Sequence, residues 1–124
     1  MNKKRPKHLA LHLIKLPLAG FVSILHRVSG ALLFLALPLL LWALQASLRS
    51  IETHTQLMIL LQHPLSKLIW LGLLWAFLHH FCAGIRYLAI DFRWASSLKM
   101  ARASSQWVMV VSLLLTVLIG AKLW

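Results

Sequence analysis

Two adjacent histidines, His79 and His80, stand inside the long apolar run LGLLWAFLHHFCAGIRYLAID. Ionisable side chains are costly in such a segment, so they are candidates for function. A histidine at that depth needs a metal ion, a haem iron or a proton relay as its partner. The alternative is a pair of histidines that only form hydrogen bonds between helices.

The residues after the histidines favour a flat, iron-containing ligand. Gly84 follows His80 by one helical turn on the same face, and because it has no side chain, a macrocycle could approach there. Arg86 lies about 9 Å further along the axis, which suits an acidic group of the same ligand. His79 offers a competing ligand, but only His80 has a glycine at its i+4 position. We therefore predict His80 as an axial ligand of a haem, with the second ligand supplied by another chain.

A second polar cluster, SILHRVSG, precedes another apolar run. Ser23 and Arg27 are four residues apart and share a helix face, so both can donate hydrogen bonds to one carbonyl oxygen or carboxylate. His26 diverges from Arg27 by about 100° and could serve a neighbouring ligand. The alternative is that Arg27 only reaches toward lipid headgroups. Ser29 and Gly30 favour close helix packing.

The composition indicates that a lipid bilayer surrounds the elements that carry these residues. The chain has 124 residues, of which 60% are apolar and only 12% are charged. A soluble domain would carry about a quarter charged residues. Three segments, at about 28–48, 65–90 and 107–124, approach the roughly 20 apolar residues that a spanning helix needs. We predict an all-α membrane protein, with residues 1–124 forming a single three-span domain.

The basic residues predict the orientation of these spans. Most of the 13 Lys and Arg side chains precede the first span or lie between the second and third, and the tail holds only Lys122. The positive-inside rule therefore places the N-terminus in the cytoplasm and the C-terminus on the far side, with residues 1–27 forming a cytoplasmic segment and the start of the first span. The loop at 49–64 is predicted to lie on the far side and to contain a short interfacial helix.

The same composition excludes several other classes of protein. The formal charge of +11 does not indicate nucleic-acid binding, because the basic residues flank apolar runs instead of forming a stripe. Neither a signal peptide nor a mitochondrial transit peptide is expected. A single cysteine, Cys82, excludes a disulfide within the chain and suits a small buried apolar residue.

The chain resembles the cytochrome b anchor subunits of succinate dehydrogenase, the membrane part of respiratory complex II. The similarity begins at Arg5–Pro6, continues through SILHRVSG and ends with the pattern H-x-x-x-G-I-R-x-x-x-x-D, which runs from His80 to Asp91. It covers essentially the whole chain. It implies a subunit that passes electrons to quinone in the respiratory chain and the tricarboxylic acid cycle, in the inner membrane of a bacterium, and that is not catalytic alone.

The resemblance also implies cofactors, partners and site residues. The chain would form half of a heterodimeric bundle with a second three-span anchor, with haem b between them, and would bind an iron–sulfur subunit that carries the flavoprotein. His80 matches the haem ligand, and Ser23, Arg27 and Asp91 match the site of the substrate ubiquinone. The haem pocket and its propionates would be bounded by His26, Arg27, Gly84, Arg86 and Tyr87.

One position departs from the family pattern, and two other functions stay open. Tyr87 follows Arg86 where the best-known bacterial form often has histidine, so the side chain here can donate a hydrogen bond but cannot carry a charge. The haem potential would differ, since nearby charges and hydrogen bonds tune it. A fumarate reductase anchor and a cofactor-free structural membrane protein are the alternatives to a succinate dehydrogenase anchor.

Overall fold

The computed structural model describes residues 15–94 and 97–124, which form four helices. They are α1 (Leu18–Arg49), α2 (Ile51–Gln62), α3 (Pro64–Asp91) and α4 (Leu98–Leu123). In length and apolar character, α1, α3 and α4 suffice to cross a membrane. This confirms the predicted all-α, three-span architecture. The sequence predictions that rest on Lys3, Lys4, Arg5, Pro6 and Lys7 lie outside the described residues.

Two of the helices begin about ten residues before the apolar runs that predicted them. α1 starts directly after Pro17, and α4 starts after Ser97, whose side chain accepts a hydrogen bond from the Met100 amide at 3.2 Å. Serine is a favoured N-cap because it satisfies an amide that the helix leaves free. Helices therefore extend past the apolar window until a cap or breaker ends them.

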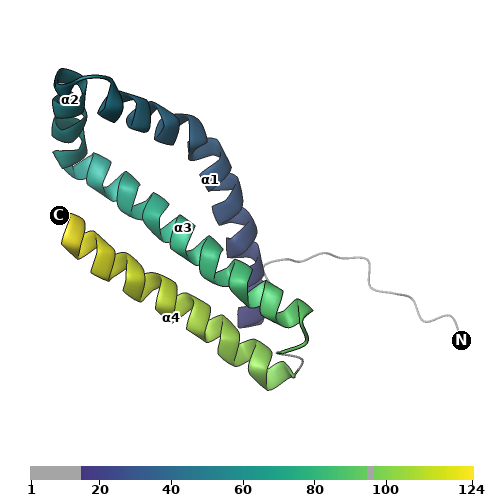
Figure 1. Ribbon diagram of the computed structural model, residues 1–124. Coiled ribbons are helices and arrows are strands. Elements are labelled where there is room, and N and C mark those ends of the chain that lie inside the picture. The colour runs from purple at the N-terminus through teal and green to yellow at the C-terminus, as the bar shows by residue number, and fades with distance from the viewer. Residues whose placement is uncertain (1–14, 95–96) are drawn as a thin grey trace, which may run out of the picture.

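The predicted short helix in the loop is α2. Ser50 and Thr53 form a capping box at its N-terminus, and Pro64 at the first position of α3 ends the connection. Proline is well tolerated there, since that amide has no partner within the helix. Figure 1 shows α2 lying across one end of the molecule, between α1 and α3.

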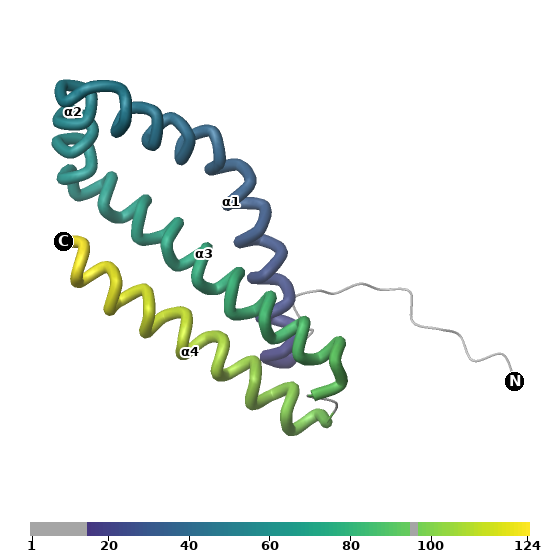
Figure 2. The backbone as a smooth tube through the Cα atoms, in the orientation of Figure 1, coloured from purple at the N-terminus to yellow at the C-terminus, as the bar shows by residue number. Residues whose placement is uncertain are grey.

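α3 and α4 lie side by side along their length, whereas α1 leaves them (Figures 1 and 2). α4 turns a row of small residues inward: Ser105, Val108, Ser112, Thr116 and Gly120. Small residues allow membrane helices to approach closely. α1 contains Pro38, the usual cause of a bend, and its second half departs from α3 toward α2.

A cavity of about 570 Å³ lies where α1 separates from α3. Its lining is almost entirely apolar and comes from all four helices: Leu33, Leu40, Ala43, Met58, Leu61, Gln62, Trp70, Leu73, Leu74, Phe77, Leu123 and Trp124. Few apolar side chains are buried in the isolated chain. Large apolar side chains such as Leu35, which is 72% exposed, cover the outer surface of the helices. This is the surface that a bilayer requires.

Candidate functional site

His80 is held in place by the first helix. Its Nδ1 lies 3.0 Å from the backbone oxygen of His26 and 3.3 Å from Oγ of Ser29. Its ring stacks on that of His26, with centroids 4.1 Å apart and planes 9° from parallel. A carbonyl oxygen only accepts hydrogen bonds, so Nδ1 carries the proton and Nε2 keeps its lone pair. This is how proteins orient a histidine that binds a metal through Nε2.

Gly30 on α1 leaves room for the His80 ring. A Cβ atom added there would lie 2.8 Å from Cε1 and 3.2 Å from Nδ1 of His80. The neighbouring Ser29 is 2% exposed and donates to the His26 backbone oxygen at 3.0 Å. The helix contact that the sequence predicted at Ser29 and Gly30 is therefore a contact with the His80 side chain.

We expect Gly30→Ala to destabilise the protein by about 1–3 kcal/mol, because an added methyl group in a filled site forces a shift of the His80 ring. Gly72→Ala is the matched control, since nothing lies within 4 Å of a Cβ added at that helical position. Thermal unfolding in detergent measures both. Equal unfolding midpoints for the two variants would show that the His80 ring does not pack against Gly30.

The adjacent His79 has a different environment. It is 0% exposed, and neither of its ring nitrogens has a hydrogen-bond partner among the described residues. It belongs to the inward face of α3, with Ala76, Leu78, Ala83 and Arg86. Its ring centroid lies 5.3 Å from that of Trp75. A ligand that arrives from outside this chain could reach the partly exposed His80 but not His79.

Gly84 and Tyr87 share the face of His80 and lie beside His26. A Cβ added to Gly84 would meet a single neighbouring atom, Nε2 of His26, at the ordinary distance of 3.9 Å. The Tyr87 ring centroid is 5.2 Å from that of His26, and its buried hydroxyl has no hydrogen-bond partner in the described residues. The site therefore presents no side chain at Gly84 and, among the described residues, an unused donor at Tyr87.

Arg86 is directed to the fourth helix. Its Nε donates to Oγ of Ser104 at 3.0 Å, and its NH2 donates to the Ala101 oxygen at 3.3 Å. The side chain is 7% exposed. Six residues correspond to about 600° of helical rotation, so Arg86 points about 120° away from His80. The axial spacing that suggested Arg86 as a neighbour of the His80 ligand did not take this rotation into account.

We expect Arg86→Met to lower stability by about 1.5–3 kcal/mol, since hydrogen bonds from a charged donor contribute more than neutral ones. Methionine keeps much of the length without leaving a buried charge. Arg102→Met is the control, because Arg102 is exposed on α4. The measurement is thermal unfolding of both variants in the same detergent, and an unchanged midpoint for Arg86→Met would contradict an anchoring role.

Ser23, Arg27 and Asp91 lie at the same end of the molecule as His80. Ser23 is half-buried and Arg27 exposed near the start of α1, and Asp91 is the exposed last residue of α3 (Figure 1). None of the three side chains forms a hydrogen bond or an ion pair with another described residue. Within the described part of the chain, nothing occupies the donors of Ser23 and Arg27.

Comparisons with known proteins identify the family of this chain. Residues 1–119 match the family described as succinate dehydrogenase/fumarate reductase transmembrane subunit. A succinate dehydrogenase cytochrome b556 subunit of Coxiella burnetii is 39% identical, over 100% of both chains. Subunits with the same name are 32% identical in Rickettsia felis, over 94% of this chain and 90% of the relative, and in Paracoccus denitrificans, over 92% and 88%.

Proposed function

Because this chain belongs to the family of succinate dehydrogenase and fumarate reductase transmembrane subunits, we propose that it binds haem b and ubiquinone as the cytochrome b anchor of succinate dehydrogenase. It is a multi-pass protein of the bacterial inner membrane, and part of an oxidoreductase complex. The observation that carries the proposal is the geometry of His80, whose Nδ1 lies 3.0 Å from the His26 oxygen while Nε2 stays free.

The residues around His80 fit a haem. Nε2 of His80 would bind the iron, and Gly84 presents no side chain beside it. The Tyr87 hydroxyl, which has no partner among the described residues, would hold the propionates together with His26 and Arg27. When bound, the haem supplies a one-electron carrier next to the quinone site. Arg86 supports this pocket indirectly, by fixing α4 against α3.

In this proposal a second ligand for the iron would come from another chain. His79 is enclosed in the chain, and His26 is stacked against His80, so neither is placed to supply that ligand. A second three-span anchor subunit would complete the haem site. The two anchors would bind the iron–sulfur subunit, which carries the flavoprotein, at the end of the bundle where α1 begins, which we place in the cytoplasm.

Ser23, Arg27 and Asp91 form the quinone site on this chain. A neutral quinone dissolves in an apolar pocket, but its carbonyl oxygens need hydrogen-bond donors there. The Ser23 hydroxyl and the Arg27 guanidinium are such donors, and the cation also stabilises the negative charge that develops on reduction. Asp91 lies at the end of α3, where it can exchange protons with water.

Co-purification tests the proposed function. A tag on this chain should bring down a flavoprotein, an iron–sulfur protein and a second small membrane protein, with succinate-dependent reduction of ubiquinone in the eluate. The names of the relatives favour succinate oxidation over fumarate reduction. Recovery of the chain without a flavoprotein would support a structural membrane protein instead.

A further inference from the structure

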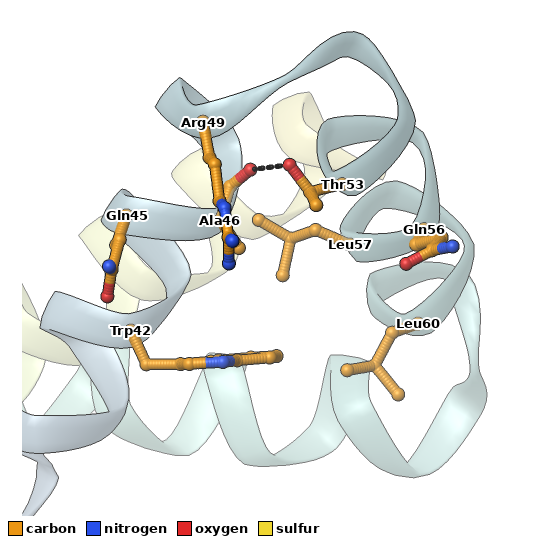
Figure 3. A pocket seen from close by; sticks show the side chains of 8 residues that line it. All are labelled: Trp42, Gln45, Ala46, Arg49, Thr53, Gln56, Leu57 and Leu60. Atoms are coloured by element: carbon orange, nitrogen blue, oxygen red, sulfur yellow. Dashed lines mark hydrogen bonds between the residues drawn. The ribbon is translucent and has the colours of Figure 1, made fainter.

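A second candidate binding site lies at the opposite end of the molecule from His80, in the corner between α1 and α2 (Figure 3). The pocket has a volume of about 370 Å³. Four residues of α1 and four of α2 line it: Trp42, Gln45, Ala46, Arg49, Thr53, Gln56, Leu57 and Leu60. None of them takes part in the function proposed above.

The pocket is built on a fixed frame. Oγ1 of Thr53 donates to the Ala46 oxygen at 2.8 Å, which ties α2 to the last turns of α1. Leu57, 5% exposed, packs into the same corner. The helices on both sides are thereby held at a set separation, so the pocket does not depend on a flexible loop.

Polar and apolar groups are separated within the pocket. Figure 3 shows the Arg49 side chain turning back from the top of the corner toward the Trp42 ring, with the amides of Gln45 and Gln56 on opposite sides. Trp42 and Leu60 form the apolar part below. The pocket thus has a cation and amide donors on one side and aromatic and aliphatic groups on the other. A phospholipid has the same order of polarity at the boundary between its headgroup and its acyl chains.

The electrostatics of the pocket favour an anion. Arg49 is the only charged residue in the lining, and it forms no hydrogen bond or ion pair with another described residue. The acidic Glu52 is nearby in the sequence but does not line the pocket. Arginine binds phosphate oxygens well because its planar guanidinium presents several donors at once.

We propose that this corner binds the phosphate group of an anionic phospholipid, with Arg49 as its main contact and Gln45 and Gln56 as further donors. A lipid is favoured over free phosphate because the faces of the Trp42 ring and the Leu60 side chain present apolar surface that an acyl chain can cover and a hydrated ion cannot use. The cavity of about 570 Å³, which residues of all four helices line, adds an apolar surface next to α1 and α2. A headgroup without net charge would leave the Arg49 charge unbalanced.

Native mass spectrometry of the purified complex tests the site. The protein is stripped of lipid and then given short-chain phosphatidylglycerol, phosphatidylcholine with the same chains, or inorganic phosphate. We expect phosphatidylglycerol adducts in the wild type and an about tenfold weaker affinity in Arg49→Gln, because a charged hydrogen-bond donor is lost. Lys67→Gln is the matched control, since it removes one positive charge at the same end of the molecule without touching the pocket.

The possible results separate the sources of the phosphate. Equal adducts in Arg49→Gln and Lys67→Gln would overturn the proposal, as would equal binding of phosphatidylcholine. Displacement of the lipid by inorganic phosphate would indicate a free-anion site instead. The visible spectrum of Arg49→Gln should match the wild type, so a failure of this inference leaves the proposed haem site untouched.

Discussion

Replacing His80 with alanine should remove the haem from the purified complex or leave it high-spin. Nδ1 of His80 is occupied by the His26 oxygen, so Nε2 is the one nitrogen that the ring can offer to iron. Alanine supplies no nitrogen to take its place, and the adjacent His79 is enclosed in the chain. Because axial ligation sets the spin state, this change has the largest effect that we expect on the cofactor.

His79→Leu is the control for this prediction. Its side chain is fully enclosed, and its ring nitrogens have no partner among the described residues, so a leucine of similar size should leave the low-spin spectrum largely intact. Absorption spectra of the two reduced variants, at equal protein concentration, give the comparison. If His79→Leu abolished the spectrum and His80→Ala retained it, the ligand assignment would be reversed.

Arg27→Leu should strongly reduce ubiquinone reduction while succinate oxidation by a soluble dye continues. The guanidinium is exposed and without a described partner, and it lies one turn from Ser23 on the same face. By analogy with lost oxyanion donors, we expect an increase of about 2–4 kcal/mol in the activation free energy for quinone reduction. Ser23→Ala removes a neutral donor only, so its effect should be smaller.

Paired assays on membranes separate this role from a structural one. Each variant is assayed with a ubiquinone analogue and with the dye, and Arg102→Leu serves as the control for loss of a positive charge near the same end. A fall in both activities would indicate that assembly has failed. Full quinone reductase activity in Arg27→Leu would leave Arg27 as a residue that contacts lipid headgroups or a propionate.

The architecture could be predicted because it depends on short-range features. Long apolar runs with almost no acidic residues identify spanning helices, since the bilayer accepts little else. The short helix in the loop was also predicted, and Ser50 caps it. Helices α1 and α4 begin about ten residues before the predicted spans, because hydropathy marks the hydrocarbon layer, whereas α1 begins directly after Pro17 and α4 directly after the Ser97 cap.

The site was harder to predict because it depends on contacts between helices. Spacing identified His80, Gly84 and their shared face, but it gave no sign that the His26 ring stacks on His80. Nor did it place Gly30 against that ring. Arg86 is the clearest example. Its spacing along the helix axis suggested a contact with the ligand of His80, but its direction around the helix leads it to Ser104 on α4.

The reduced-minus-oxidised visible spectrum of the wild-type complex, purified through this chain, tests the central claim most directly. Two nitrogen ligands on a b-type haem keep the iron low-spin, so we expect sharp reduced bands at about one haem per copy of this chain. A complex that purifies with its flavoprotein and iron–sulfur subunit but shows no such bands would contradict a haem at His80.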